Sequence, residues 1–136
     1  MNRLPGRISA VEAAGSIALI EVAGGGHCFT ATLIGLGSEL AAWRVDMPVI
    51  LMFKETEVSL AKNLSGLISM RNRLPATVTS IERGRLLTKV GLDLDGHALG
   101  SVITTKSSHL LQLAVGDQVE GLVKANEMSL FRDAAA

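Results

Sequence analysis

The sequence has few aromatic residues, no net charge and almost no cysteine, and each shortage excludes a class of protein. Its 136 residues include one Trp, three Phe and no Tyr, so it has few rings on which the bases of single-stranded nucleic acid would stack. Thirteen Lys and Arg residues balance 13 Asp and Glu residues, whereas proteins that bind duplex phosphates carry a basic surface. We therefore expect no nucleic-acid partner.

The cysteine and histidine positions argue against catalysis and metal binding. Cys28 is the single cysteine, which excludes an intrachain disulfide and a multi-cysteine metal site, and we expect it to be a small core residue. His27, His97 and His109 have no catalytic or zinc spacing, and the sequence contains no nucleophile elbow, zincin motif or P-loop. The prediction is a protein that is not an enzyme and has no cofactor and no metal ligand set.

Hydropathy and the first residues of the chain indicate where in the cell the protein is expected. No apolar run approaches the roughly 18 residues that a membrane span requires, since the run 45–53 is interrupted by Asp46 and Pro48. The chain opens with residues 1–5 (MNRLP), which are not a basic and then apolar leader. At 48% hydrophobic and 19% charged residues, the chain is not of the disordered class. We expect a cytoplasmic protein without direct membrane contact.

The chain repeats itself at an offset of 70 residues. Residues 2–5 (NRLP) recur as 72–75, and without a gap Gly26-His27 matches Gly96-His97 and Lys54 matches Lys124. Residues 2–60 and 72–130 are identical at 15 of 59 positions, against roughly four expected from ordinary composition. We therefore predict two copies of one module, over residues 1–62 and 63–136.

Each copy has the pattern of a small β-barrel. In the second copy, apolar and polar residues alternate with period two, and Asp95-Gly96 is a hairpin signal. The strands are predicted over residues 76–82, 86–94, 97–104, 118–124 and 127–131. One short helix is predicted over 107–113, with Ser107 as its N-cap. The predicted fold class is all-β, with two tandem OB-like five-stranded antiparallel barrels, each with one short helix.

A module of about 60 residues cannot cover all of its apolar surface by itself. The run 49–53 (VILMF) is apolar on both faces, which is typical of a buried core strand and also of an oligomer interface. We expect the sister copy, and then another chain, to cover the excess.

Three motifs of the second copy carry a family resemblance. The copy opens with S-x-R-N at 69–72, continues with T-x-x-S at 104–107, and has the segment Leu122-Val123-Lys124-Ala125 in its penultimate strand. In this order and spacing the pattern resembles the molbindin (Mop) module of the TOBE family, which binds molybdate and tungstate. The resemblance covers residues 68–131 directly and residues 2–60 through the repeat. The tandem arrangement is similar to that of stand-alone di-Mop molbindins and of molybdate-responsive regulators.

The resemblance implies a set of residues that contact the oxyanion. The ligand side chains and backbone amides that it implies are Ser69, Met70, Arg71, Lys124 and Ala125. The residues that close the site from a neighbouring module, usually of another subunit, are Thr104 and Ser107. Taken singly, these residues also fit ordinary structural roles, as turn formers, solvated charges or a strand-edge lysine.

The first copy departs from the family pattern. No Ser or Arg precedes Asn2, and Ile34 and Gly37 stand where the second copy has Thr and Ser. Of the ligand side chains only Lys54 remains. Because Asn2 persists without the other ligands, we interpret it and Asn72 as structural residues that hold the first strand. We predict that the first copy is a structural or weakly binding partner.

The residue types suit a tetrahedral dianion whose oxygens all accept hydrogen bonds. Backbone amides, hydroxyls and one ammonium all donate hydrogen bonds, and none of them carries a negative charge that would repel the anion. The resulting prediction is a cytoplasmic molybdate- or tungstate-binding protein for molybdenum storage, buffering or homeostasis. It is expected to be a homo-oligomer with sites between chains, with a trimer first and a dimer next.

Two other functions stay open. Residues 57–61 ahead of S-x-R-N resemble the C-terminal region of molybdate-transporter ATPases. The chain would then be an oxyanion-sensing regulatory segment of such an ATPase or of a molybdate-responsive transcription regulator. A nucleic-acid-binding OB barrel is disfavoured by the zero net charge and the few aromatic residues.

Overall fold

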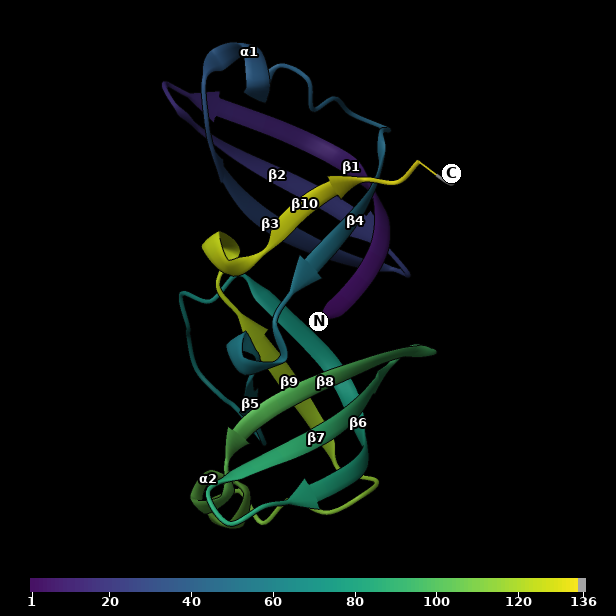
Figure 1. Cartoon of the computed structure of the whole chain (residues 1–136), viewed down its shortest axis with the longest axis vertical. Helices are drawn as coiled ribbons and strands as arrows, with labels where there is room; N and C mark the ends of the chain where they lie inside the picture. Colours follow the sequence, from purple (N-terminus) through teal and green to yellow (C-terminus); the bar gives the residue numbers. More distant parts are fainter. Residues whose placement is uncertain (135–136) are drawn as a thin grey trace. The chain divides into compact units, whose positions relative to one another are not determined.

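The structure is a computed structural model of the chain, in which residues 1–134 are described. The chain forms two compact units (Figure 1). Unit 1 contains Met1–Asn2 and Lys54–Val123, and unit 2 contains Arg3–Phe53 and the segment from Lys124 onward. Each unit contains one five-stranded sheet in which neighbouring strands pair.

Unit 1 holds most of the second copy of the repeat. Its strand order is β5-β9-β6-β7-β8, and the pairs are antiparallel. The strands are β5 (Ser59–Ala61), β6 (Asn72–Arg83), β7 (Leu87–Leu94), β8 (His97–Thr104) and β9 (Gln118–Val123). The unit also contains the 3-10 turn η1 (Glu55–Glu57) and the helix α2 (Thr105–Leu110). The hydroxyl of Ser101 on β8 donates to the carbonyl oxygen of Val58 at 2.6 Å, which fastens β8 to the segment after η1.

Unit 2 holds most of the first copy and has the corresponding arrangement. Its strand order is β10-β4-β1-β2-β3. The strands are β1 (Asn2–Ala14), β2 (Ile17–Gly24), β3 (His27–Ile34), β4 (Pro48–Phe53) and β10 (Ser129–Arg132). The helix α1 (Gly37–Leu40) and the 3-10 turn η2 (Ala125–Glu127) complete it. The all-β class and the two five-stranded antiparallel sheets, each with a short helix, are confirmed.

The last strand of each copy belongs to the sheet of the other copy. β5 pairs with β9, with Ser59 opposite Leu122, and β10 pairs with β4, with Leu130 opposite Leu51. In Figure 1 the yellow β10 lies beside β4 in the sheet of the first copy. The repeat is continuous in sequence to residue 60, but the compact units change over after Phe53 and after Val123. The chain therefore exchanges its terminal strands between the two sheets.

The core follows from strand alternation. Thr88, Val90, Leu92 and Leu94 point inward from β7 and are buried, as the period-two pattern predicts. On β4, the alternate residues from Val49 to Phe53 are fully buried and those between them are half-buried. The apolar run 49–53 is therefore covered more completely on one face than on the other.

Two local predictions are wrong. Cys28 is exposed rather than part of the core, because its neighbour Phe29 takes the inward position on β3 and is buried. Helix α2 spans Thr105–Leu110 rather than 107–113, and its N-cap is Thr104 rather than Ser107. The Thr104 side-chain oxygen accepts from the Ser107 amide, so Ser107 lies in the first turn. Within residues 1–134, no helix is long and apolar enough to cross a membrane.

Candidate functional site

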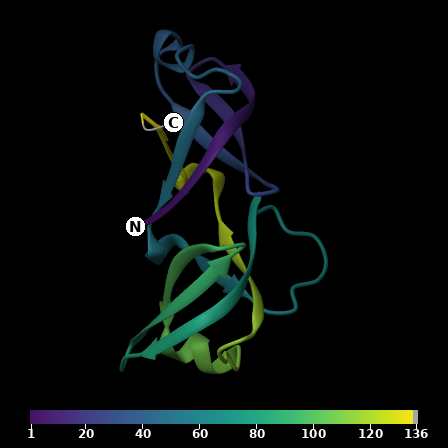
Figure 2. The ribbon, with the colours of Figure 1, turned by 90° about the vertical axis from the view of Figure 1, so that its right-hand side faces the viewer.

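The S-x-R segment lies directly before the first long strand of unit 1. Residues 62–71 leave β5 and run as an extended loop beside the sheet (Figure 2). This loop returns to the sheet at Asn72, the first residue of β6. Ser69 and Arg71 are exposed, Met70 is half-buried and Asn72 is fully buried. The buried asparagine thus fixes the point at which the exposed S-x-R segment joins the sheet.

Arg71 and Lys124 adjoin the same rung of the unit 1 sheet. Asn72 is the register partner of Val123 in the antiparallel pair of β6 and β9. Arg71 precedes Asn72 and Lys124 follows Val123, so each lies one residue outside this rung. Because the strands run antiparallel, both chain segments leave the sheet at the same end. The register of unit 1 therefore links two cationic residues that are 53 positions apart in the sequence, since each directly adjoins a member of the same strand pair.

Lys124 begins the 3-10 turn η2, whose first backbone amide has no acceptor within the turn. Lys124 is the N-cap, with φ −67 and ψ 146, and its carbonyl accepts from the Glu127 amide at 3.0 Å. The Ala125 amide, at the first position of the turn, has no acceptor within it. It is therefore a backbone donor next to the Lys124 side chain.

A neighbouring arginine on β6 is already neutralised. Arg73 forms a two-pronged ion pair with Glu120, with Nε to Oε2 at 2.6 Å and Nη2 to Oε1 at 2.7 Å. This hydrogen bonding raises the pKa of Arg73 and lowers the pKa of Glu120 below its usual value. The charge of Arg73 is therefore engaged within the sheet and is a poor candidate for an anion ligand.

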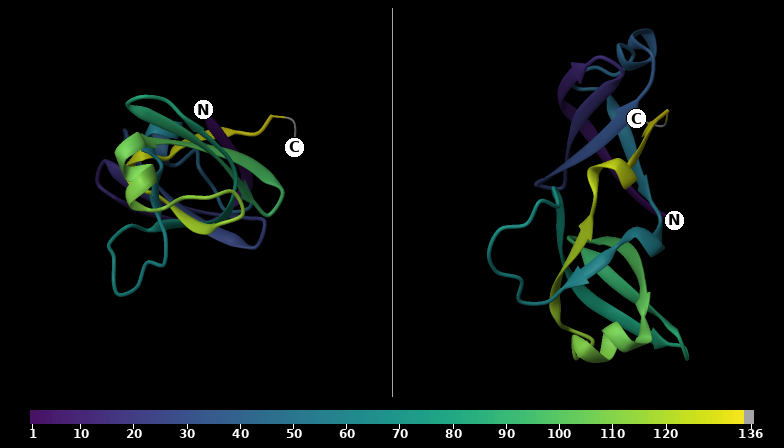
Figure 3. Two further views of the ribbon diagram at one scale, coloured as in Figure 1. Left: turned by 90° about the horizontal axis from the view of Figure 1, so that it is seen from below. Right: turned by 90° about the vertical axis from the view of Figure 1, so that its left-hand side faces the viewer.

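Thr104 and Ser107 lie at the other end of unit 1. Thr104 ends β8 opposite Leu87, near the end of β6, where Arg83 faces Thr88. The length of β6 from Asn72 to Arg83 corresponds to roughly 35 Å of extended strand. Figures 1 and 3 show α2 at the end of unit 1 away from the start of β6. The structure therefore does not bring Thr104 and Ser107 to Arg71 within one copy of unit 1.

The two hydroxyl side chains form a small hydrogen-bonded pair. Thr104 Oγ1 donates to Ser107 Oγ at 2.8 Å and accepts from the Ser107 amide at 3.1 Å. Because Thr104 uses its proton in this pair, the proton of the Ser107 hydroxyl stays available to another acceptor. Thr104 is exposed and Ser107 is half-buried, so the pair faces the surface.

Apolar surface surrounds this hydroxyl pair. Leu86 and Leu110 are 76% and 75% exposed. A shallow hollow of about 300 Å³ adjoins Ser107 and is lined by Ser59, Leu60, Ile103, Ser107, Leu110 and Leu111. Exposed apolar patches of this kind mark surfaces that another molecule covers.

The chain matches one family over both copies of the repeat. The TOBE domain family matches residues 1–60 and 68–130. The chain belongs to the TOBE domain family. The two matched segments coincide with the two sequence copies, so each copy is one TOBE domain in sequence. In space, each sheet takes its fifth strand from the other domain.

Relatives of this TOBE chain include transport and molybdate-binding proteins. It is 40% identical to the molybdenum import ATP-binding protein ModC of Brucella abortus over 123 residues, which cover 90% of this chain and 32% of ModC. It is 43% identical to the molybdenum-pterin-binding protein MopA of Rhodobacter capsulatus over 63 residues, 46% of this chain and 24% of MopA. The chain thus spans about a third of the length of ModC.

One solved structure matches nearly the whole TOBE chain. It is the cytoplasmic molybdate-binding protein ModG in a form with molybdate bound. The TM-score is 0.90 with 27% sequence identity, covering 97% of this chain and 96% of that one. The match includes both units, so the likeness extends to the tandem arrangement and not only to a single barrel.

The two TOBE domains of the chain share structural residues but not the candidate ligands. Asn2 is buried, and its amide group donates to the Gly100 carbonyl at 2.9 Å and accepts from the Gly100 amide at 2.8 Å. This supports the interpretation of the repeated asparagine as structural. Lys54 begins η1 in the same backbone conformation as Lys124, with φ −74 and ψ 146. In contrast, α1 has Leu36 as its N-cap and no capping side chain.

Sequence analysis missed the residues that hold α2 in place. These are Lys62, Arg83 and Asp117, whose hydrogen bonds reach the helix and the loop after it. The repeat contains a usable signal, because Ala13 and Met47 stand at the positions of Arg83 and Asp117 in the first copy. Over residues 1–134, no group of three or more His, Cys, Asp and Glu side chains is placed to hold a metal ion.

Proposed function

We propose that this chain binds molybdate as an intact oxyanion. The observation that carries the proposal is the pairing of Asn72 with Val123, because Arg71 and Lys124 each directly adjoin a member of this pair in the sequence. The proposed ligand groups there are the side chains of Ser69, Arg71 and Lys124 and the backbone amides of Met70 and Ala125. The ModG likeness over nearly the full length of both chains supports this assignment.

The chemistry of these groups suits a dianion. Arg71 and Lys124 supply positive charge, while hydroxyl and amide groups supply directed donors. Hydrogen bonds to a charged partner are each worth about 1.5–3 kcal/mol, so four or five of them reach micromolar affinity after the entropic cost of binding. The ion is bound whole, and the proposed activity requires no nucleophile, general base or bond cleavage.

The proposed site is completed by a second chain. Thr104 and Ser107 lie at the opposite end of unit 1 from Arg71, so we assign them to the site of a neighbouring protomer. The exposed Leu86 and Leu110 beside them supply apolar surface for that contact. We propose a closed homo-oligomer, with a trimer as the first choice and a dimer as the next. Storage or buffering of molybdenum in the cytoplasm is the role that we propose for it.

Titration calorimetry on protein of known solution mass tests the proposal. Molybdate and tungstate, which have nearly the same size and charge, should both bind, whereas sulfate should bind far more weakly. A cage sized for the larger dianion leaves its donors too far from the smaller one. Equal competition by sulfate would contradict the proposal. Light scattering on the same sample measures the mass, and a monomer that binds molybdate tightly would exclude a site shared between chains.

A second candidate function is favoured by the relative ModC. The chain is 40% identical to ModC while covering 32% of its length, as expected if the same pair of domains also exists as a segment of a longer protein. In that case the bound oxyanion would act as a regulatory signal to an attached ATPase or DNA-binding part. An immunoblot of cells that express the native gene distinguishes the two. A band near 14.3 kDa favours the stand-alone protein, and a much larger band favours the regulatory segment.

A further inference from the structure

Helix α2 is too short to hold its own position. It has six residues, and isolated helices well below about 12 residues are unstable in water. Its C-terminal end is closed by hydrogen bonds from the Gln112 amide to His109 and from the Leu113 amide to Ser108, at 3.0 and 3.1 Å. Gln112 has a φ of 49, a conformation that favours glycine. External contacts must therefore fix where α2 presents Thr104 and Ser107.

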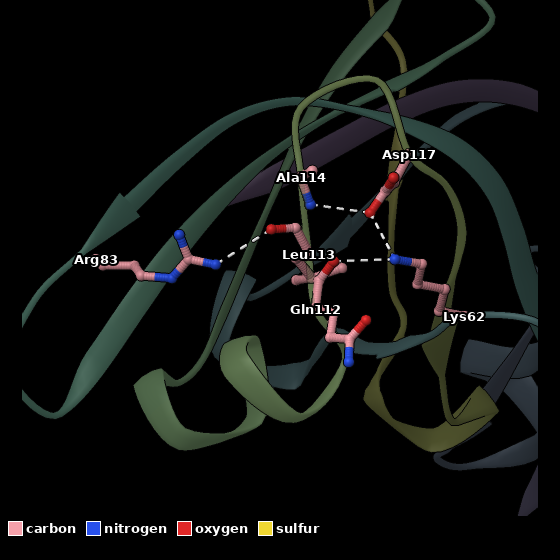
Figure 4. Close-up of polar contacts among 6 residues, drawn as sticks. All are labelled: Lys62, Arg83, Gln112, Leu113, Ala114 and Asp117. Atoms are coloured by element: carbon pink, nitrogen blue, oxygen red, sulfur yellow. Dashed lines mark hydrogen bonds and ion pairs between the residues drawn. The ribbon is translucent and has the colours of Figure 1, made fainter.

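Arg83 connects β6 to this helix and to the loop after it. Its Nε donates to Ser108 Oγ at 3.1 Å, and its Nη2 donates to the Leu113 carbonyl at 3.2 Å (Figure 4 shows the second bond). Ser108 is fully buried, and its hydroxyl donates in turn to the Thr105 carbonyl at 2.6 Å. One planar guanidinium thus connects the last residue of β6 to Ser108 within α2 and to Leu113 in the loop after it.

A second anchor holds the loop after α2. Lys62 Nζ donates to the Gln112 carbonyl at 3.0 Å and to Asp117 Oδ2 at 2.9 Å, and the same carboxylate oxygen accepts from the Ala114 amide at 2.9 Å (Figure 4). Lys62 begins the loop that leads to the S-x-R segment. The anchors therefore fix the loop after α2 from the side opposite to Arg83.

The first copy lacks the counterparts of Arg83 and Asp117. Ala13 stands at the position of Arg83, Gly35 at that of Thr105 and Met47 at that of Asp117. Ser38 matches Ser108 in sequence but is exposed rather than buried. Arg83 and Asp117 therefore occur in the copy that carries T-x-x-S, and Ala13 and Met47 replace them in the copy that lacks it.

We propose that Arg83 is a positioning residue for oxyanion binding, acting through α2 on the Thr104–Ser107 hydroxyl pair. This inference rests on the proposed function, in which these hydroxyls close the site of a neighbouring protomer. Arg83 does not touch the ligand. It sets the direction of the Ser107 hydroxyl, and its removal frees α2 to occupy orientations in which that donor misses the anion.

The test compares Arg83→Ala, Arg83→Lys and Arg85→Ala in the full chain. The last variant removes the same charge two residues away and is the matched control. Molybdate affinity is measured by calorimetry and should fall about tenfold or more in Arg83→Ala, in line with the loss of one charge-assisted hydrogen bond. Arg83→Lys retains the charge but not the planar two-pronged geometry, so it should be intermediate. Arg85→Ala should bind as the wild type does.

Two further measurements separate positioning from general destabilisation. Val119→Ala truncates a buried residue of β9 and lowers the melting temperature without touching α2, so it should retain molybdate affinity. An equal loss of affinity in Val119→Ala would overturn the proposal. Amide exchange of Ser107, Leu111 and Leu113 without ligand should accelerate in Arg83→Ala only, and unchanged exchange would likewise overturn it. If the wild type binds no molybdate, the proposed function fails, while the exchange data still decide whether Arg83 holds α2.

Discussion

The two copies of the repeat share a scaffold and differ at the groups that would meet an anion. Both contain the asparagine at the start of the long strand, the lysine before the 3-10 turn and the final Ser-Leu strand. Only the second has the Thr104–Ser107 pair, and Ala13 and Met47 replace Arg83 and Asp117 in the first. Lys54 and Lys124 have nearly the same backbone conformation, so the backbone at this lysine does not distinguish the two copies. Substitutions at matched positions therefore test which residues the fold requires and which residues binding requires.

The largest expected difference between the copies is in molybdate affinity. Arg71→Ala or Lys124→Ala removes a charge-assisted hydrogen bond and should cost about 1.5–3 kcal/mol of binding free energy, or roughly tenfold to a hundredfold in affinity. Lys54→Ala is the matched control and should bind as the wild type does. Calorimetry measures all three. Equal losses from Lys54→Ala and Lys124→Ala would show that the first copy also builds a site.

The two 3-10 turns differ in how they pack, and a substitution at Gly100 tests this. A Cβ placed on Gly100 would fall on the carboxyl group of Glu55, which also lies 3.6 Å from Lys89 Nζ. In unit 2, Thr30 and Ala125 stand at the matching positions. Gly100→Thr should therefore destabilise the fold by about 1 kcal/mol, because the flexible Glu55 side chain must move away from Lys89.

Unit 2 supplies the control for this prediction. Adding Glu55→Ala to Gly100→Thr gives unit 1 the same Thr and Ala pair that unit 2 has at Thr30 and Ala125, and it should recover most of the lost stability. Urea unfolding of the single and double variants measures the coupling. Simple addition of the two effects would mean that Glu55 does not pack over Gly100.

Adding an N-cap side chain to α1 should have a smaller effect, and it should raise the stability of the fold. Leu36 is the N-cap residue, exposed and without a side-chain acceptor, and Glu39 is the third residue of the helix. Leu36→Ser creates the sequence S-x-x-E, in which the two side chains satisfy backbone amides reciprocally. The free energy of unfolding should rise by about 0.5–1 kcal/mol relative to Leu36→Ala. Chemical denaturation checks it, and no gain would mean that α1 has other constraints.

The smallest expected effect is a pH dependence that the first copy lacks. The hydrogen bond from Lys62, followed by that from the Ala114 amide, lowers the pKa of Asp117 below its usual value of 3.8. A carboxyl with a lowered pKa in the folded state stabilises the fold above its usual value, and this contribution is lost as the pH falls through the lowered pKa. Asp117→Asn should therefore lower the melting temperature near neutral pH.

Melting temperatures at acid pH test this prediction. The difference in melting temperature between Asp117→Asn and the wild type should shrink as the pH falls below 3.8, because the wild-type carboxyl is then also neutral. Glu12→Gln, an exposed change in the first copy, is the control. If the difference in melting temperature stays constant over this range, ionisation of Asp117 does not contribute to stability.

Much of the fold could be predicted from local patterns, while the strand exchange could not. Alternation locates β7 and β8, and Asp95-Gly96 locates the turn between them. The destination of the last strand is hidden because Ser59-Leu60 and Ser129-Leu130 are identical, so either segment suits either sheet. Cys28 was predicted to be a core residue because cysteine is often buried. Its alternation with the buried Phe29 would have assigned it to the outer face instead. The Thr104 cap was missed because Ser107 is also a good N-cap residue.

The candidate site could be predicted only as far as residue types. The motifs name Arg71 and Lys124, and only the register of β6 and β9 shows that both directly adjoin the pair of Asn72 and Val123. The hydrogen bonds of Arg83 depend on the path of α2, which no local pattern specifies. They could be suspected only by comparing the two copies position by position, as at Ala13 and Arg83.

The exchanged strands have a consequence for a chain that is cut. A protease that cleaves within residues 62–71 would break the only covalent link between the first repeat and the second. Each fragment would still supply a strand that is paired within the other fragment's sheet, β5 against β9 and β10 against β4. The nicked protein should therefore stay together through gel filtration and separate only in denaturant. For the same reason, a gene fragment encoding one repeat alone would yield a sheet without its own fifth strand, and such chains would have to complement one another in pairs.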